Sequence, residues 1–425
     1  MANTSKEQLV KVIDFWLKSA ESGQLFPRAL TDRVDIKSKE VVDIVGPRRS
    51  GKSSVMKLLV RKVKDNGRWL YVNFEDPFFV ENNYPQVIEE LVETYTEYFG
   101  GAPKFLFFDE IQSIKNWETA VRKLRDSEHF KIFITGSSSK LLSSELSTLL
   151  SGRHLSYQLL PLSFSEYLSF HNVEIADEKD VMLKSGALSK YFSEYLKIGG
   201  FPEAVLSDNL ELLKQYYNDI VQKDIVARYD VRDKDVLEKM GVFLFSNSAK
   251  ILSVAALSRT YNLSHQTAVN YIEYFKDAFL LFDLPQFSYS LKTTQKAFKK
   301  MYAVDTGMAN AVSMSFSEDR GRMLENAVFL HLKRVGGDLY YYKGKSGEVD
   351  FVVKRVDGGL GLIQVCWGLS DIKTKEREVA SLTTAMKNLR VTDATIVTFD
   401  ERGEIESSEG KIRILPVYKF IHTKI

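Results

Sequence analysis

Cysteine is nearly absent from the sequence, since Cys366 is the single thiol in 425 residues. One cysteine cannot form an internal disulfide framework or a zinc site of several thiolates, and this scarcity is typical of a reducing compartment. The six histidines are scattered, with no spacing that suits a metal site. No apolar run approaches the roughly 18 residues of a membrane span, and residues 1–23 have the pattern of an amphipathic helix rather than a signal peptide. We therefore expect a cytoplasmic protein without a membrane partner.

An excess of charge of one sign is also missing, because 58 basic and 56 acidic residues give a formal net charge of +2. Any affinity for nucleic acid must therefore come from local basic patches. The chain is too long for one compact core, and its ordinary globular composition predicts two to four domains.

A basic loop bracketed by glycines follows the apolar run VVDIV, residues 41–45, and leads into a helical pattern. The loop matches G-x-x-x-x-G-K-[ST], in which backbone N–H groups surround phosphate oxygens. Lys52 supplies a cation for the β- and γ-phosphates, and the Ser53 hydroxyl can ligate Mg²⁺. The flanking strand and helix favour ATP binding over the alternative, a glycine-rich turn that binds nothing. The predicted nucleotide contacts are Gly46, Pro47, Arg48, Arg49, Ser50, Gly51, Lys52, Ser53 and Ser54.

A second carboxylate for the metal is expected on a neighbouring strand. Residues 105–108 are apolar and run directly into Asp109 and Glu110. Such a run in a parallel sheet is buried on both faces and ends at the edge where ligands bind. Asp109 would hold Mg²⁺, directly or through water, and Glu110 would polarise the attacking water. The alternative is a strand that merely ends in two acids.

A further apolar run, residues 131–135, ends at Gly136 and is followed by serines. The hydroxyl of Ser137 or Ser138 could touch the γ-phosphate or the attacking water from a strand between the other two. The alternative is an ordinary polar turn, which is common after a strand.

Two more segments extend this pattern, because residues 69–76 form a predicted strand and residues 119–128 a predicted helix. A phosphate loop followed by alternating strands and helices predicts a parallel, three-layer α/β domain. Arg153 lies beyond the last of these strands. It is a candidate arginine finger that stabilises transition-state charge, in its own subunit or a neighbouring one, and a structural pair with a carboxylate is the alternative.

The motifs GPRRSGKS, FFDEIQ, ITGSSS and SGR…LLPLSFSEYL, followed by GGFPEAV and DIVQKDIVARYDVRD, resemble those of one prokaryotic family. This family consists of AAA+-type ATPases whose C-terminal half carries a domain of unknown function, and the resemblance spans nearly the whole chain. It implies an ATPase core at 1–162, a helical lid at 163–235, a winged-helix segment at 236–316 and a restriction-endonuclease-like domain at 317–425. It also implies that the serines after Gly136 hold a sensor position, and that assembly could bring Arg153 to a neighbour's site.

Residues 251–284 contain two helical patterns joined at Asn262 and Leu263, the pattern of a helix-turn-helix. Ser264 is expected to cap the second helix, whose exposed start would face duplex DNA. Residues 284–304 contain four lysines and no acid, which suits a β-wing on phosphates. The alternative is a winged helix that contacts only proteins. The predicted DNA contacts are His265, Gln266, Asn270, Lys292, Lys296, Lys299 and Lys300.

The C-terminal segment places Glu325 in a predicted helix, Asp350 in a predicted strand and Gln364 in the next strand. These residues resemble the constellation of restriction-endonuclease-like nucleases, in which two carboxylates hold Mg²⁺ and a lysine positions the hydrolytic water. Here Gln364 replaces the second acid and Cys366 replaces the lysine, which weakens both roles. We therefore expect a degenerate domain, with an active nuclease as the alternative. Lysines that could reach this site from elsewhere are Lys345, Lys373 and Lys375.

These features together predict an ATPase that uses ATP and Mg²⁺, and whose nucleotide state controls a DNA-binding winged helix and a nuclease-like domain. The alternatives are a regulatory protein-binding module with little turnover and an ATP-dependent DNA nuclease. The expected partners are ATP and duplex DNA, with a homo-oligomer or a partner protein as further options.

Overall fold

The structure is a computed structural model that describes residues 6–137, 152–313, 319–344, 347–355 and 357–423. The chain divides into two compact units, residues 1–160 with 277–279 and residues 161–276 with 280–425, here called the first and second units. The division falls at the end of the expected ATPase core. Among the described helices, none combines the length and the apolar character that crossing a membrane requires.

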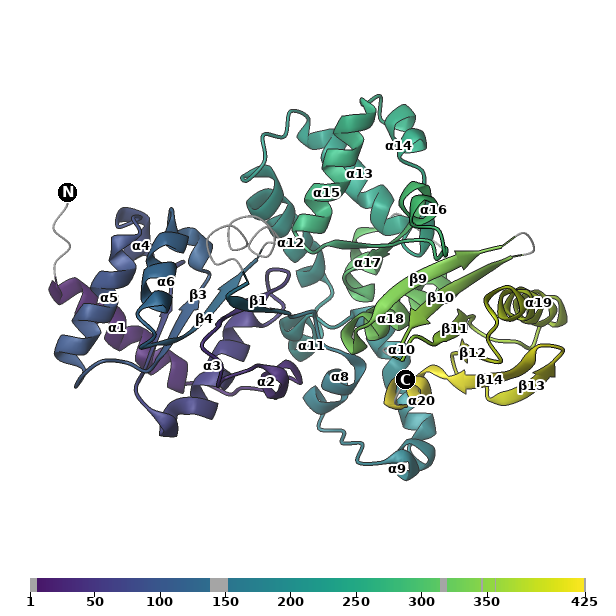
Figure 1. Cartoon of the computed structure of the whole chain (residues 1–425), viewed down its shortest axis with the longest axis horizontal. Coiled ribbons are helices and arrows are strands. Elements are labelled where there is room, and N and C mark those ends of the chain that lie inside the picture. The colour runs from purple at the N-terminus through teal and green to yellow at the C-terminus, as the bar shows by residue number, and fades with distance from the viewer. Residues whose placement is uncertain (1–5, 138–151, 314–318, 345–346, 356, 424–425) are drawn as a thin grey trace. The chain divides into compact units, whose positions relative to one another are not determined.

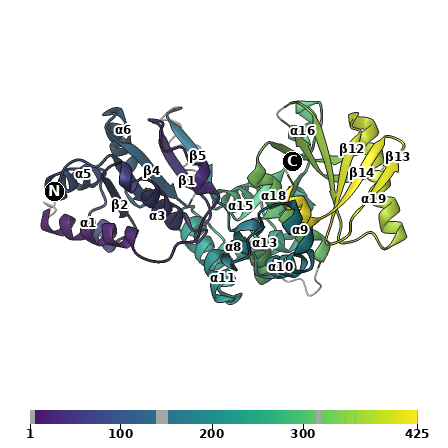
Figure 2. The same cartoon turned by 90° about the horizontal axis from the view of Figure 1, so that it is seen from below.

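The first unit is a parallel sheet between helices, as the alternating sequence pattern predicts. Its described strands pair in the order β2-β3-β4-β1-β5, and every pair is parallel. Helices α1 and α3 lie on one side of the sheet and α6 on the other (Figure 2). The strands are β1 (Val41–Val45), β2 (Trp69–Asn73), β3 (Phe105–Asp109), β4 (Lys131–Gly136) and β5 (His154–Gln158). The helices are α1 (Lys6–Glu21), α2 (Leu30–Arg33), α3 (Lys52–Val63), η1 (Lys64–Asn66), α4 (Pro77–Glu81), α5 (Gln86–Tyr98), η2 (Ile111–Ser113) and α6 (Trp117–Asp126).

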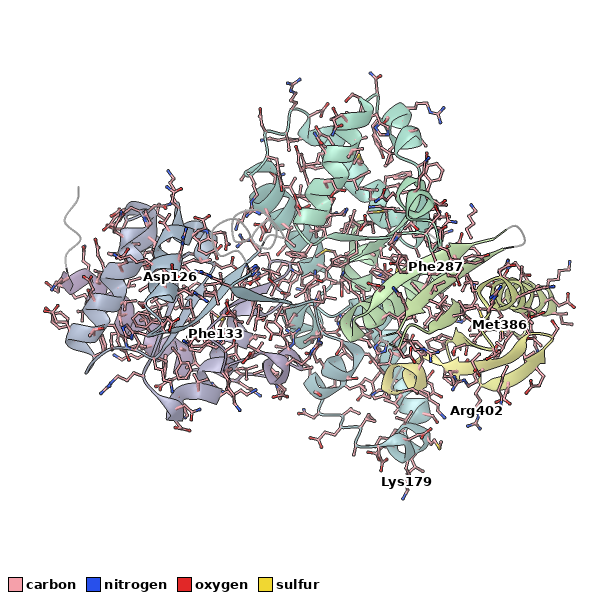
Figure 3. The ribbon with its side chains drawn as sticks, viewed as in Figure 1. Asp126, Phe133, Lys179, Phe287, Met386 and Arg402 are labelled. Carbon is pink, nitrogen blue, oxygen red and sulfur yellow. The ribbon has the colours of Figure 1, made fainter. Side chains whose placement is uncertain are left out.

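The core of the first unit forms where alternate strand residues meet the apolar face of α3. Phe107 of β3 and Phe133 of β4 stack with their ring centroids 4.6 Å apart, and Figure 3 labels Phe133 within the sheet. Leu59 and Val60 of α3 belong to the same buried cluster. Strands β1, β3 and β4 are buried along their whole length, as expected for central parallel strands covered on both faces.

The second unit begins with the helices expected to form a lid. They pack against a later helix, α17 (Thr306–Val312). Asn310 of α17 donates to the Leu196 carbonyl (3.0 Å), and Asp305, which caps α17, accepts from the Gly200 N–H (2.6 Å). Their action as a lid over nucleotide stays a prediction. The helices are α8 (Phe164–Phe170), α9 (Glu178–Leu183), α10 (Ser185–Ile198), α11 (Pro202–Ser207), α12 (Glu211–Ile220) and the π-helix η4 (Val221–Val226).

The middle of the second unit is a small antiparallel sheet, and four described helices precede or separate its strands in the chain. Strand β8 lies between β6 and β7 and pairs with both. The turn between the two expected helix-turn-helix elements passes through Asn262, whose φ is 50°. The elements are α13 (Lys234–Ser246), β6 (Lys250–Leu252), α14 (Val254–Thr260), α15 (His265–Asp277), β7 (Leu281–Leu284), α16 (Leu291–Lys296) and β8 (Lys299–Ala303).

The C-terminal part is a mixed sheet of order β13-β14-β12-β11-β10-β9, with β11, β12 and β14 parallel and the other pairs antiparallel. Its core lies under α19 and includes Phe287 and Met386, both labelled in Figure 3. The elements are α18 (Arg320–Val335), β9 (Asp338–Lys343), β10 (Glu348–Lys354), β11 (Leu360–Val365), α19 (Ile372–Leu389), β12 (Asp393–Thr398), β13 (Gly403–Ser407), β14 (Gly410–Pro416) and α20 (Val417–His422).

Candidate functional site

The ATPase motifs come together at one edge of the parallel sheet. The carboxyl ends of parallel strands share an edge, and β4 lies between β1 and β3 (Figure 1). The phosphate loop after β1, Asp109 at the end of β3 and Ser137 directly after β4 therefore lie along that edge. Ser137 is fully buried there, whereas Ser138 lies outside the described residues. The prediction that the serine follows a strand between the other two is confirmed.

The two glycines of the loop each meet a backbone requirement. A Cβ on Gly46 would lie 2.0 Å from the carbonyl oxygen of Leu159, whose N–H in turn donates to the Val45 carbonyl (2.7 Å). Gly51 has a φ of 98°, in the left-handed region that favours glycine, and it precedes the first turn of α3. Of the other loop residues, Pro47 and Ser50 are buried, Arg48, Ser53 and Ser54 are half-buried, and Arg49 is exposed.

Lys52 is buried, with 4% of its surface exposed, and its ammonium is held by the loop itself. Its Nζ donates to the carbonyl oxygens of Gly46 and Pro47, each at 3.2 Å. The same nitrogen lies 3.3 Å from Oε1 of Glu110. The cation predicted for the phosphates and the carboxylate predicted for the attacking water are therefore neighbours.

Asp109 is completely buried and hydrogen-bonded on both carboxylate oxygens. The Thr135 hydroxyl donates to Oδ1 (2.5 Å), while the Tyr71 hydroxyl (2.9 Å) and the Asn73 amide (3.2 Å) donate to Oδ2. Burial and the adjacent Glu110 charge raise the pKa of Asp109, although a hydrogen bond from Ser53 lowers it. These donors fix the carboxylate in one orientation.

The residues present fit a magnesium ion that is shared with nucleotide phosphates. The Ser53 hydroxyl lies close enough to the Asp109 carboxylate to lower its pKa, so two oxygen ligands of the kind that Mg²⁺ prefers are neighbours. Within the described part of the chain, no group of three or more histidine, cysteine or carboxylate side chains is arranged to hold a metal by itself. A magnesium ion here would therefore depend on the phosphates for its remaining ligands.

Glu110 follows Asp109 in a left-handed conformation, with a φ of 51°. Its backbone N–H donates to the Thr135 hydroxyl (2.8 Å), and its carboxylate accepts from the Gln112 amide (2.5 Å). Burial would raise the pKa of Glu110, but the Lys52 ammonium and the Gln112 hydrogen bond outweigh it, and the pKa is lowered. The side chain is therefore a buried carboxylate that stays charged at neutral pH.

Several residues of the site were missed in the sequence. Thr135 joins Asp109 to Glu110 from the neighbouring strand, and Tyr71 and Asn73 reach Asp109 from β2. All three lie on predicted strands, and the sequence does not show which strands are neighbours and therefore which side chains reach Asp109.

Arg28 was also missed. It is 4% exposed, and its guanidinium donates to the carbonyls of Ser50 and Leu160, each at 2.8 Å. It supports the phosphate loop from an irregular segment that has no recognisable pattern. Arg48 of the loop pairs with Glu75 (2.6 Å), which follows β2.

Arg153 lies at the amino ends of the parallel strands, whereas the phosphate loop lies at their carboxyl ends. Its carbonyl accepts from the N–H of Val41, the first residue of β1, whereas the loop follows the last residue of that strand. Five residues of strand span about 16 Å, farther than an arginine side chain reaches. Its guanidinium contacts Asp126 (3.1 Å), a residue labelled in Figure 3. A role within its own subunit is therefore wrong, and a role in a neighbour's site stays a prediction.

The predicted DNA contacts occupy two places in the second unit. His265 and Gln266 are exposed at the start of α15, where Ser264 accepts from the Thr267 N–H (3.0 Å) as the expected cap. The Gln266 amide donates to Asn270 (2.9 Å). Lys292 and Lys296 lie on α16, between β7 and β8, and Lys299 is the first residue of β8. Lys292 is exposed, and the side chain of Lys296 is outside the described structure. Lys299 pairs with Asp283 (2.5 Å).

Lys300 corrects the prediction for the basic segment, because it is not a DNA contact. Its side chain is 3% exposed and lies within 3 Å of carboxylate oxygens of Glu325, Glu348 and Asp350. Burial disfavours its charge, but these carboxylates, led by Asp350, outweigh burial and raise its pKa well above the usual range. The sequence showed a lysine-rich segment but not the acids that neutralise it.

The predicted nuclease constellation is only partly brought together. Glu325 and Asp350 both contact Lys300, and the side-chain Oε1 of Gln364 accepts from the backbone N–H of Asp350 (3.2 Å). The Gln364 amide, however, donates to Glu378 (2.7 Å), away from the other two side chains. Of the candidate lysines, Lys373 and Lys375 are exposed near the start of α19, and Lys345 lies outside the described residues.

The class of the first unit follows from this geometry and from one comparison. Residues 38–168 match the family described as "AAA domain". A parallel sheet with a glycine-bracketed loop after β1 and a buried acid at the end of β3 defines a P-loop ATPase domain. Residues 189–319 and 320–420 match two domains of unknown function (DUF8612 and DUF4143).

The chain as a whole is similar to proteins from two distant organisms. An uncharacterized protein of Methanocaldococcus jannaschii is 40% identical over 397 residues, which cover 89% of this chain and 87% of that protein. An uncharacterized protein of Haemophilus influenzae is 30% identical over 345 residues, which cover 77% of this chain and 83% of that protein. The chain belongs to the family of these proteins. A solved structure of AMPPCP-bound DnaA from Aquifex aeolicus is 14% identical, covers 55% of this chain and 81% of its own, and has a TM-score of 0.24, too low to carry an argument.

Proposed function

We propose that the first unit hydrolyses ATP in the presence of Mg²⁺. The observation that carries the proposal is the grouping of a buried ammonium and two buried carboxylates at the carboxyl edge of the sheet. Lys52 Nζ lies 3.3 Å from Glu110, and Thr135 hydrogen-bonds both Asp109 and the backbone of Glu110. A strand that merely ended in two acids would not place them against the lysine of a phosphate loop.

Each group has a role that its environment supports. Lys52 offsets the negative charge that moves onto the phosphate oxygens, and Asp109 with Ser53 would hold Mg²⁺, which neutralises further charge when bound. The water oxygen forms a bond to the γ-phosphorus while the bond to the bridging oxygen breaks, which yields ADP and phosphate. Glu110, kept charged beside Lys52, orients the water and accepts its proton.

Phosphate release by the purified full chain tests this proposal. We expect Lys52→Ala and Glu110→Gln each to lower turnover by at least ~10²-fold, a typical loss for charge stabilisation or base catalysis. Calorimetry should show that Glu110→Gln still binds ATP and that Lys52→Ala binds it weakly. Lys64→Ala and Glu81→Gln, at exposed positions of the same unit, serve as matched controls. Equal turnover in all four variants would remove the mechanism.

We propose further that residues 234–303 form a winged helix that binds duplex DNA. Three observations support this: the element order α13, β6, α14, α15, β7, α16, β8, the central place of β8 in the sheet, and the cap of Ser264 on the second helix of the pair. The expected β-wing between β7 and β8 contains the short helix α16. The exposed start of α15 offers His265 and Gln266, and the exposed Lys292 stands on the connection between β7 and β8. The alternative is a module that binds a protein partner.

The salt dependence of binding to duplex DNA distinguishes the two. Phosphate contacts predict an affinity that falls steeply with salt, and Lys292→Ala should lower the slope of log K against log salt by about 1. Lys299→Ala should have a smaller effect, because Asp283 already neutralises that lysine in part. Lys214→Ala, an exposed lysine on α12, is the control. A flat salt response would favour a protein partner. If nucleotide state controls this activity, ATP and ADP will give different DNA affinities in the Glu110→Gln variant.

A further inference from the structure

The acidic cluster of the C-terminal domain surrounds a single ammonium group. Lys300 Nζ lies 2.9 Å from Glu325, 2.6 Å from Glu348 and 2.9 Å from Asp350. The ammonium donates hydrogen bonds to Glu325 and Asp350, and its contact with Glu348 is an ion pair. The lysine comes from β8, in the small middle sheet, whereas the acids come from α18 and β10 of the C-terminal domain.

The surrounding groups hold the acids in place without adding positive charge. Glu348 and Asp350 alternate along β10, so they point to the same face of the strand. The second oxygen of Asp350 accepts from the Val365 N–H (2.9 Å), and Glu325 accepts from the Tyr302 hydroxyl (2.7 Å). Tyr302 is in turn fixed by stacking on Phe329, with ring centroids 4.0 Å apart.

The charge balance of this cluster calls for a cation. Three carboxylate side chains converge on one place and a single ammonium lies between them, with 3% of its side chain exposed. Asp350 is buried and Glu325 nearly so, whereas 30% of the Glu348 side chain is exposed. Little water screens the first two, so burial and the Asp350 charge raise the pKa of Glu325 to about 8 although Lys300 opposes this shift. Without the ammonium the repulsion between these acids would be stronger still. With Lys300 between them, these three side chains are not arranged to hold a metal ion, in line with the lack of any such group among the described residues. Oxygen ligands from three carboxylates are nevertheless the kind of set that binds hard divalent cations once no ammonium lies between them.

We propose that Lys300 is a built-in cation that occupies the place a divalent metal ion would take between Glu325, Glu348 and Asp350. Strand β8 therefore does two things at this site. It closes the carboxylate cluster against metal ions, and it joins the middle sheet to the C-terminal domain through three ion pairs. The C-terminal domain binds a divalent cation here only when the lysine is removed or displaced.

Manganese binding tests the proposal, because free Mn²⁺ is measured directly from its electron paramagnetic resonance signal. We expect Lys300→Met, a change that keeps most of the side-chain volume, to bind Mn²⁺ at least about tenfold more tightly than the wild type. Lys387→Met, at an exposed position of α19, is the matched control and should behave as the wild type does. Asp350→Asn added to Lys300→Met should abolish the gain, which assigns the new ion to this cluster. Any Mn²⁺ bound near Ser53 contributes equally in every variant.

Thermal stability gives a second readout of the same cluster. Removal of one partner from a buried ion pair is strongly destabilising, so Lys300→Met should lower Tm by about 10 °C without metal. Mn²⁺ should recover part of that loss and leave the wild type unchanged, because an ion that binds only the folded state stabilises it. If Lys300→Met does not fold, the double variant Lys300→Met/Glu325→Gln should recover folding by removing one of the opposed charges.

Three results would overturn the proposal. The first is a wild-type chain that binds Mn²⁺ in a way that Asp350→Asn abolishes. The second is a folded Lys300→Met variant that gains no Mn²⁺ affinity. The third is a Lys300→Met variant with the Tm of the wild type in the absence of metal, which would mean that the lysine charge does not offset the three acids.

Discussion

Replacement of Thr135 by valine is the sharpest test of how the ATPase site is held together. The side chain is 1% exposed, and its hydroxyl donates to Asp109 (2.5 Å) while it accepts from the Glu110 N–H (2.8 Å). Valine keeps the shape of the side chain and removes both bonds. The buried N–H of Glu110 then has no acceptor, and Asp109 loses a donor to a charged group. We expect a cost of about 2–4 kcal/mol in the stability of the first unit.

That cost should appear as a Tm lower by about 5–15 °C for the transition of the first unit, measured by calorimetry on the full chain. Turnover should fall by roughly 10–100-fold, because Glu110 is no longer held against Asp109 in its left-handed conformation. Thr135→Ser keeps the hydroxyl and should stay close to the wild type in both measurements. A valine variant with unchanged Tm and unchanged turnover would refute the view that this hydroxyl couples the two acids.

Two further predictions concern the loop and the edge of the sheet. Gly46→Ala should abolish ATP binding in calorimetry, because its Cβ would lie 2.0 Å from the Leu159 carbonyl oxygen. The control is Gly186→Ala on α10, where a Cβ would meet nothing within 4 Å and should have little effect. Normal ATP binding by Gly46→Ala would contradict the geometry. His154 Nδ1 lies 2.8 Å from a carboxylate oxygen of Asp43. The protonated ring donates a hydrogen bond to this oxygen, and the bond outweighs burial and raises the pKa of His154 above its usual 6.5. The stabilisation is therefore complete below pH 6.5 and is lost as pH rises through the raised pKa. Tm measured from pH 5.5 to 9 should show this loss in the wild type and not in His154→Gln, and identical profiles would disprove it.

The parts of the site that could be predicted from sequence are those encoded by contiguous residues. The loop from Gly46 to Ser53 and the pair Asp109-Glu110 each carry their role in a short motif, because backbone curvature and strand ends are local properties. Thr135 and Tyr71 could not be found in this way. Their contacts with Asp109 depend on which strands are neighbours, and the order β2-β3-β4-β1-β5 is not written in any one segment.

The errors have the same origin in long-range contacts. Arg153 follows β4 in the chain. Because β5 pairs in parallel with β1, Arg153 lies at the end of the strands opposite the phosphate loop. Lys300 lies in a lysine-rich stretch, yet its partner acids Glu325, Glu348 and Asp350 follow much later in the chain and decide its role. The number of lysines in a short segment therefore does not show whether one of them pairs with acids that are distant in the sequence.

The placement of Lys300 also bears on how this protein is divided for experiments. The two matched domains of unknown function meet between residues 319 and 320, so a fragment begun at that boundary would contain all three acids and not their lysine. Such a piece would carry three neighbouring carboxylates without the ammonium that lies between them in the full chain, and our proposal predicts that it binds calcium, magnesium or manganese from the buffer. Nuclease activity or metal binding measured on that fragment would therefore differ from that of the full chain, in which Lys300 is present.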